Sequence, residues 1–240
     1  TDTGKVYRKK GYQIPESGKA AKGTNIINII QVEQGERVQA MLHYRENEED
    51  AELFLFMVTK QGIVKRLPVS ALKNIRQSGI RALTLDEGDE LVTVRETDGT
   101  KKIIIATHDG SAVCFDENDV RPMGRTAVGV RGIRLREGDY VVGAARAKEG
   151  HEVLAITEKG YGKKTPVEEY RVTGRGGLGV RNYMVTEKTG SVIGIKVVDS
   201  SEDLLLVTQG GILIRTPVAN IRSAGRATQG VIVMRFKEEG

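Results

Sequence analysis

The sequence repeats itself five times, and this repetition constrains the possible folds more than any other feature. Each unit carries a polar turn that ends in glycine ("TDTG", "TKQG", "THDG", "TEKG" and "TQGG"), and a short strand-like run follows each turn. The last glycines of these turns stand 58, 48, 50 and 51 residues apart, at Gly4, Gly62, Gly110, Gly160 and Gly211. A regular period of about 50 residues is typical of proteins built from similar units set side by side or around an axis.

Each unit contains about four short strand-like runs. The runs are rich in Val and Ile and end at Gly or Asp-Gly turns, whereas helical signals are limited to short turns at Val69–Asn74 and Val167–Tyr170. A single four-stranded sheet cannot cover its own faces and edges, and radial packing of several sheets solves this problem. We therefore predict an all-β fold, a propeller-like disc of four-stranded blades.

The whole chain, residues 1–240, is predicted to be one domain. The first unit lacks an apolar run before its turn, and the last unit stops before its closing strands, so we expect six blades in the intact domain. The five visible repeats span approximately residues 1–51, 52–101, 102–151, 152–203 and 204–240.

One glycine-rich stretch, "VTGRGGLGV" at residues 172–180, matches the G-x-G-x-x-G fingerprint of dinucleotide-binding loops through Gly174, Gly176 and Gly179. Such a loop requires a helix that opens at the third glycine and an acidic residue about 20 positions later. Here the following residues, "VRNYMVTEKTG", are strand-like. The equivalent stretches of two other units, "GRTAVGV" and "GRATQGV", lack the fingerprint. We therefore interpret the stretch as a blade loop that enters a strand.

The net charge of +5 conceals an uneven distribution. In each unit, one segment runs from the glycine that ends the polar turn to the later glycine-containing stretch, such as "GRTAVGV" or "GRATQGV". These segments together contain 22 of the 37 Lys and Arg residues but only 6 of the 32 Asp and Glu residues. Basic residues recur there in three columns, which are Arg8, Arg66, Lys164 and Arg215; Arg76, Arg121, Arg171 and Arg222; and Lys19, Arg125, Arg175 and Arg226. Further basic residues of these segments are Lys5, Lys9, Lys10, Lys65 and Lys163.

Equivalent positions on blades around an axis would form a continuous basic band. Lys and Arg contacts to phosphates give strong, salt-sensitive binding that does not depend on base sequence. We therefore predict that all of these basic residues contact the backbone of double-stranded DNA, which a curved band would bend. Two alternatives remain open. The cations could merely solvate strand ends, or the disc could bind an acidic protein partner.

Other classes of site have little support in the sequence. Cys114 is the only cysteine, and His43, His108 and His151 are far apart, so we expect neither disulfides nor a metal site. The acidic turns "DEGDE" and "REGDY" recur between strands and are interpreted as turn formers. No apolar run is long enough to span a membrane. No set of residues suggests a catalytic centre or a bound cofactor.

The stretches "GRTAVGVRGIRLREGDYVVG", "TEKGYGKKTPVEEYR" and "GRATQGVIVMR" resemble the family of C-terminal domains of the bacterial DNA gyrase A subunit. The resemblance implies a β-pinwheel, a disc whose blades exchange strands, that wraps DNA around a basic rim. It also implies a parent type IIA topoisomerase that uses ATP and Mg²⁺ to introduce negative supercoils. The implied partners are the remainder of the same polypeptide and the gyrase B protein, in a heterotetramer. The implied location is the bacterial cytoplasm, at the nucleoid and not at a membrane.

The resemblance also has gaps. The family's Gln-Arg-Arg-Gly-Gly-Lys-Gly box is expected before Thr1, and in "GRGGLGV" Leu178 stands where the box has lysine. The corresponding C-terminal domain of topoisomerase IV, which acts in decatenation, is therefore an alternative. The family's cleaving tyrosine, metal site and ATPase all belong to other parts of the enzyme. We therefore expect no catalytic residue in this stretch.

Overall fold

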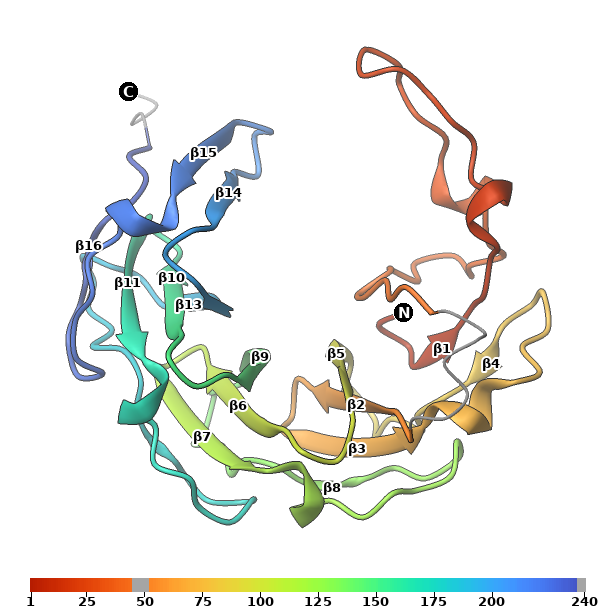
Figure 1. Ribbon diagram of the computed structural model, residues 1–240, viewed down its shortest axis with the longest axis horizontal. Coiled ribbons are helices and arrows are strands. Elements are labelled where there is room, and N and C mark those ends of the chain that lie inside the picture. Colours follow the sequence, from red (N-terminus) through yellow and green to blue (C-terminus); the bar gives the residue numbers. More distant parts are fainter. Residues whose placement is uncertain (45–51, 237–240) are drawn as a thin grey trace.

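The computed structural model describes residues 1–44 and 52–236, whose strands form an open arc of small antiparallel sheets (Figure 1). We call these sheets blades A to E, in the order of the arc. Blade B contains β5 (Leu91–Thr97), β2 (Phe54–Thr59), β3 (Ile63–Pro68) and β8 (Val130–Arg131). Blade C contains β9 (Val141–Ala147), β6 (Lys102–Thr107), β7 (Ser111–Asp116) and β12 (Val180–Arg181). Blade D contains β13 (Val192–Val198), β10 (Glu152–Thr157), β11 (Tyr161–Pro166) and β16 (Val231–Ile232).

The described parts of the two end blades are smaller. Blade A pairs β1 (Lys5–Val6) with β4 (Ile80–Arg81), and blade E pairs β14 (Asp203–Val207) with β15 (Leu213–Pro217). The described helices are single 3₁₀ turns, η1 to η6, at Gly11–Gln13, Ile26–Asn28, Val69–Leu72, Glu117–Asp119, Val167–Glu169 and Val218–Asn220. None of them is long and apolar enough to cross a membrane. The predicted all-β fold is confirmed.

The blades exchange strands. In each complete blade the inner three strands come from one unit, and the outermost strand comes from the next unit along the chain. The two-residue strand β8 pairs with β3 (Val64 opposite Val130), β12 pairs with β7, and β16 pairs with β11. Strands β5, β9 and β13 line the inner side of the arc, and β8 and β16 lie along its outer side (Figure 1). The fold is therefore a β-pinwheel, as the resemblance implied.

The core lies between the blades, which explains the near-continuous apolar runs. In β6, Ile103 and Ile105 pack with Phe56 of blade B, because alternate side chains of a strand point to opposite faces. Ile104, on the other face of β6, packs with Val153 of blade D. A strand that is covered on both faces needs apolar residues at odd and even positions alike.

The glycine before each outer strand is required by close packing. Gly179 has a φ of +76°, and a Cβ atom built on it would lie 2.1 Å from the carbonyl oxygen of Ala112. Gly129 and Gly230 are placed in the same way against Val64 and Gly162. The residues after Gly179 form the strand β12 and not a helix. The interpretation of this stretch as a blade loop is confirmed, and the glycine serves the approach of the outer strand to β7.

Candidate nucleic-acid interface

The outer strands carry a row of exposed arginines at the edge of the arc. Arg81, Arg131 and Arg181 are the last residues of β4, β8 and β12, and all three side chains are exposed. The sequence prediction missed this row. Its signal is an arginine two residues after Gly79, Gly129 and Gly179, the glycines that directly precede the outer strands, and the fifth unit has Ile232 at that position.

A second row of arginines joins neighbouring blades along this edge. The Nη1 atom of Arg125 donates a hydrogen bond to the Arg81 carbonyl at 3.3 Å. Arg175 donates to the Arg131 carbonyl at 3.0 Å. In the same way Arg226 donates to the Arg181 carbonyl at 2.9 Å. The contact therefore repeats three times, and each repeat brings the guanidinium of one blade next to the exposed arginine of the preceding blade.

The second of the three predicted columns is also exposed. Its members flank the loops that lead to the outer strands and are Arg76, Arg121, Arg171 and Arg222. Together, the two edge rows and this column form what we call the rim, whose members are Arg76, Arg81, Arg121, Arg125, Arg131, Arg171, Arg175, Arg181, Arg222 and Arg226. Arg76 lies three residues before Gly79, whereas Arg121, Arg171 and Arg222 each lie eight residues before the glycine of their outer strand. Because the other members come from equivalent positions of successive units, the rim follows the curvature of the arc.

The basic residues of the first and last units lie in less regular surroundings. Lys9, Lys10 and Lys19 are exposed. Arg8 is exposed as well and donates to the Lys73 carbonyl at 3.5 Å. Lys5 is half-buried and forms an ion pair with Glu33. At the other end, exposed Arg215 donates through Nε to Asp203 at 2.8 Å, so part of its charge is already neutralised.

Two predicted contact residues are buried, and the structure corrects their role. Lys65 and Lys163 have no exposed surface, and each Nζ atom donates three hydrogen bonds to backbone carbonyls at 2.5–3.0 Å. Burial lowers the pKa of each ammonium to about 8. Neither side chain can reach a phosphate from this position. The sequence pattern is misleading here because the strands β3 and β11 are covered on both faces.

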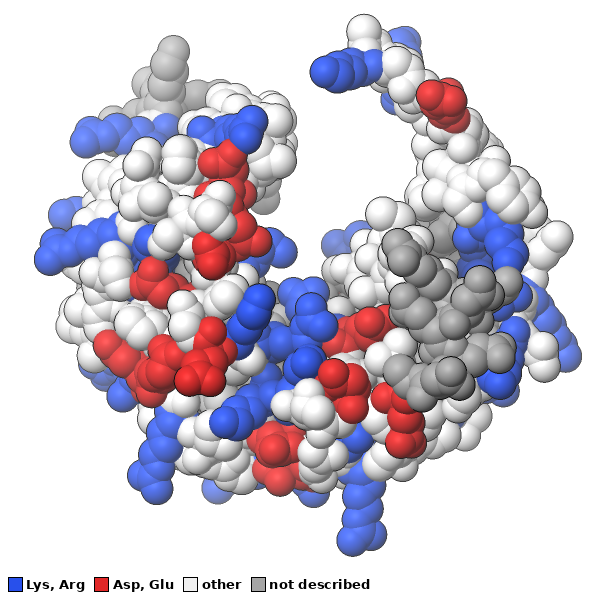
Figure 2. Space-filling model, viewed as in Figure 1, with Lys and Arg blue, Asp and Glu red and all other residues white. Residues whose placement is uncertain are grey.

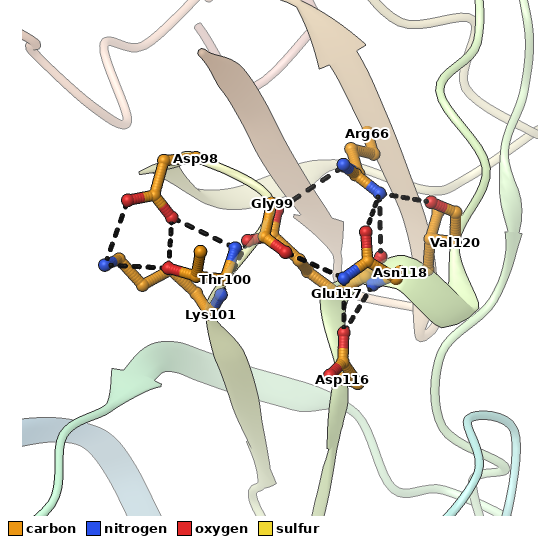
Figure 3. Close-up of polar contacts among 9 residues, drawn as sticks. All are labelled: Arg66, Asp98, Gly99, Thr100, Lys101, Asp116, Glu117, Asn118 and Val120. Carbon is orange, nitrogen blue, oxygen red and sulfur yellow. Dashed lines mark hydrogen bonds and ion pairs between the residues drawn. The ribbon is translucent and has the colours of Figure 1, made fainter. Parts of the chain in front are cut away.

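Arg66 and Lys164 are corrected in the same way. Arg66 lies 3.4 Å from Glu117, a carboxylate with no exposed surface, and it donates to Asn118 at 3.0 Å (Figure 3). Its guanidinium also stacks 3.9 Å from the centre of the Phe54 ring. Buried Lys164 lies 3.4 Å from Glu152. Arg66 thus joins blade B to the segment that follows β7 of blade C, whereas Lys164 pairs with Glu152 within blade D. Neither cation is available to a ligand.

The acidic residues are placed mainly away from the rim. Figure 2 shows Lys and Arg side chains projecting around the outer edge and a further group of them at the inner side of the arc, while most of the visible Asp and Glu lie on the face between the two. Part of the acidic charge stabilises turns, as predicted. Asp89 accepts hydrogen bonds from the backbone N–H groups of Gln61 and Glu90. Asp139 repeats this arrangement in the next blade.

One group of possible metal ligands occurs in the described part of the chain. His108, Asp109 and Asp139 lie together, and the histidine Nδ1 is 2.9 Å from Asp109. Because Asp139 accepts hydrogen bonds from the N–H groups of Asp109 and Tyr140 and His108 pairs with Asp109, the arrangement is a polar cluster at the turns of blade C. Cys114 is buried, and burial raises the pKa of its thiol to about 11, so it behaves as an apolar core residue.

The fold and the rim define a class, that of β-pinwheel discs with a basic outer edge. The family described as "DNA gyrase C-terminal domain, beta-propeller" matches five segments, residues 1–43, 54–98, 101–148, 151–199 and 202–240. The chain belongs to this family. The recognition made from the sequence is thereby confirmed.

Relatives and solved structures agree with this assignment. The chain is 59% identical over 236 residues to the DNA gyrase A subunit of Streptococcus pyogenes and 58% identical over 238 residues to that of Halalkalibacterium halodurans. These matches cover 98% and 99% of the chain but only 28% of either relative. Two solved structures are similar to the chain. The C-terminal domain of DNA topoisomerase IV matches with a TM-score of 0.88 and 26% identity, and the match covers 98% of this chain and 73% of that one. The DNA gyrase A C-terminal domain matches with a TM-score of 0.86 and 25% identity, and the match covers 99% of this chain and 77% of that one.

Proposed function

We propose that this domain binds duplex DNA along its rim and bends it around the arc, without catalysing a reaction itself. The observation that carries the proposal is the repetition of exposed arginines at equivalent places on successive blades, with most acidic residues elsewhere. Phosphates along a DNA backbone are the periodic anions that such a curved row fits. The arginines that bridge neighbouring blades do so through Nη1, and a guanidinium has five N–H groups, so one bridging bond leaves other donors that can bind phosphate oxygens.

The role of the parent protein follows from family membership and is part of the proposal. The relatives are DNA gyrase A subunits, of which the chain spans about a quarter. We propose that the parent belongs to an ATP- and Mg²⁺-dependent type IIA topoisomerase of the bacterial cytoplasm and nucleoid. The remainder of the same polypeptide and the gyrase B protein would be its partners in a heterotetramer. The rim would present a DNA segment for strand passage, so that the complete enzyme introduces negative supercoils.

A topoisomerase IV type of parent is the second candidate. It is favoured by one observation, the TM-score of 0.88 with the C-terminal domain of DNA topoisomerase IV. The identities of 48–59% to DNA gyrase A subunits support the gyrase assignment more strongly. Supercoiling of relaxed plasmid by the reconstituted full-length enzyme separates the two, because a gyrase introduces negative supercoils whereas a decatenating enzyme only removes links and supercoils.

Binding to DNA is tested with labelled duplexes of about 20 and about 100 base pairs at several salt concentrations. With about 6–10 phosphate contacts, affinity should fall about 10³–10⁵-fold between 50 and 200 mM salt. The longer duplex should bind more tightly, and fluorophores at its ends should approach each other. Weak binding that depends neither on length nor on salt would overturn the proposal and favour an acidic protein partner.

The role of the rim is tested with three charge removals at exposed arginines, Arg131→Gln, Arg171→Gln and Arg181→Gln together. The matched control removes three exposed lysines that lie outside the rim, Lys102→Gln, Lys148→Gln and Lys196→Gln. Each lost phosphate contact lowers the slope of log affinity against log salt by about 1, so we expect a slope lower by about 3 in the rim variant. An equal loss in the control would show that only net charge matters.

A further inference from the structure

The two buried lysines occupy the same place in two different blades. Lys65 lies in β3 of blade B and Lys163 in β11 of blade D, opposite Met57 and Ala155 of the neighbouring strands. Neither side chain has exposed surface. Among the described residues, neither ammonium has a carboxylate within ion-pair distance, and both are surrounded by backbone carbonyls.

Most of the carbonyls that bind these ammonium groups belong to rim loops. Lys65 donates to the carbonyls of Arg125 at 2.7 Å and Ala127 at 3.0 Å, in the loop that ends in β8. Lys163 donates to three carbonyls of the loop that ends in β16, and one of them is the carbonyl of Arg226 at 2.5 Å. Arg125 and Arg226 are the residues that bridge to the preceding blade. Each lysine therefore holds the backbone from which a rim arginine projects.

Blade C lacks this arrangement. Its residue at the equivalent place in β7 is Val113, which has no group that can bind the loop carbonyls. A half-open pocket of about 480 Å³ lies there, lined by Ala112, Val113 and Cys114 and by the loop that contains Gly174, Arg175 and Gly177. In this blade the loop is the glycine-rich one. Its backbone is held from the outside, because the Gly176 N–H donates to the Gly132 carbonyl at 2.7 Å and the Gly177 carbonyl accepts from the Arg134 N–H at 2.8 Å. Arg175 donates to the carbonyls of Asp119 and Arg131 at 2.9 and 3.0 Å, but among the described residues no β7 side chain donates to the carbonyls of this loop.

A buried ammonium is a strong constraint on the loop that covers it. If the loop moved away, the charge would remain buried without hydrogen bonds, which is costly. A valine imposes no such requirement, so no buried charge opposes movement of the loop of blade C away from β7. The difference in one side chain therefore predicts a difference in loop mobility between blades.

We propose that Lys65 and Lys163 are positioning residues that fix the rim arginines Arg125 and Arg226 for the DNA backbone, and that the loop of blade C is the adaptable segment of the rim. The part that concerns DNA rests on the proposed function. In blades B and D the arginines are held in place before DNA arrives, so little ordering is required on binding. In blade C the loop adjusts to the path of the duplex.

The test uses the 240-residue chain with Lys65→Met, Lys163→Met and the reverse change Val113→Lys. Methionine keeps the length of the side chain but donates no hydrogen bond. Amide hydrogen exchange reports loop opening without DNA. In Lys163→Met we expect amide exchange in residues 225–230 to be at least tenfold faster than in the unmodified chain. In Lys65→Met we expect the same increase in residues 124–129. In Val113→Lys we expect slower exchange in residues 174–179.

Binding to a duplex of about 100 base pairs separates positioning from simple loss of charge. Lys196→Met is the matched control, because it removes an exposed lysine of β13 that holds no rim loop. We expect Lys65→Met and Lys163→Met to weaken binding at least fivefold more than the control. If a methionine variant does not fold, Val113→Lys still decides, because the proposal requires slower loop exchange there.

The outcomes are distinct. Unchanged exchange of the rim loops in all three variants would overturn the proposal, whatever the DNA result. Faster exchange with DNA affinity equal to that of Lys196→Met would show that the lysines hold the loops but do not position them for DNA. If the unmodified chain does not bind duplex DNA at any salt concentration, the proposed function fails and the positioning role fails with it, while the exchange data still report whether the lysines hold the loops.

Discussion

Two groups of basic side chains lie side by side in this domain and have opposite surroundings. Ile63 of β3 lies opposite the exposed rim residue Arg131 of β8. The buried Lys65 and Arg66 follow Ile63 in β3 by only two and three residues. Strand β3 is covered by neighbouring blades, whereas β8 is the last strand of its sheet. The same residue type therefore stabilises the fold in one strand and is available to a ligand in the next.

This comparison assigns different measurable consequences to the two groups. Changes at the buried cations and their partners should lower the free energy of unfolding. Changes at exposed rim arginines that do not bridge blades, such as Arg131, should affect binding and leave stability almost unchanged, because exposed side chains without buried partners contribute little.

The largest effect is expected at the ion pair of Arg66 with Glu117. The substitution Glu117→Gln keeps the size of the side chain and an oxygen that accepts from the Lys101 N–H, but it leaves the Arg66 charge buried without its counter-ion. Loss of one partner of a buried pair costs about 3–5 kcal/mol. Urea unfolding should therefore show a free energy of unfolding lower by about 3 kcal/mol.

Two matched changes sharpen this result. Asp98 pairs with Lys101 nearby but is exposed, so Asp98→Asn should cost less than about 1 kcal/mol (Figure 3). Arg131→Gln at the rim should change stability by less than about 0.5 kcal/mol. A loss in Glu117→Gln no larger than in Asp98→Asn would mean that the buried pair does not stabilise blades B and C.

The next largest effect concerns the packing of the outer strand β12 against β7. In Gly179→Ala the new methyl would meet the Ala112 carbonyl, and the φ of +76° is unfavourable for alanine, so we expect a loss of about 2 kcal/mol. Gly174, in the same loop, has a φ outside the left-handed region, and no heavy atom lies within 4 Å of the place that a methyl group would take. Gly174→Ala should therefore be neutral within about 0.5 kcal/mol in thermal or urea unfolding. Equal losses at the two positions would contradict the packing account of the glycine motif.

The smallest effect is a pH dependence of the buried lysines. Burial lowers the pKa of Lys163 to about 8 in the folded protein, whereas an unfolded lysine keeps its proton to about pH 10. Between these values the unfolded chain binds more protons, so the free energy of unfolding rises with pH. The difference in stability between the unmodified protein and Lys163→Met should grow by about 1 kcal/mol from pH 7 to pH 9. A constant difference would mean that the three carbonyls offset the effect of burial on the pKa.

Much of the architecture could be predicted from the sequence because it depends on local chemistry. The period of about 50 residues, the strand runs, the Asp-Gly turns and the columns of arginine are all visible in the printed chain. The side chains of the second column, Arg76, Arg121, Arg171 and Arg222, are exposed, as their predicted contact with DNA requires. Family membership also followed from sequence alone, because several distinctive stretches occur in order.

Which cations are exposed was decided only by the tertiary structure. The sequence pattern treats Lys65 and Arg125 as equivalent basic residues, yet one is buried beneath the loop that carries the other. The rim row of Arg81, Arg131 and Arg181 was missed because each unit gives its outer strand to the preceding blade. Strand exchange brings together residues about 60 positions apart, and burial depends on those distant neighbours. A repeat thus determines which positions are equivalent, while the packing of one unit against the next determines which of them meet solvent.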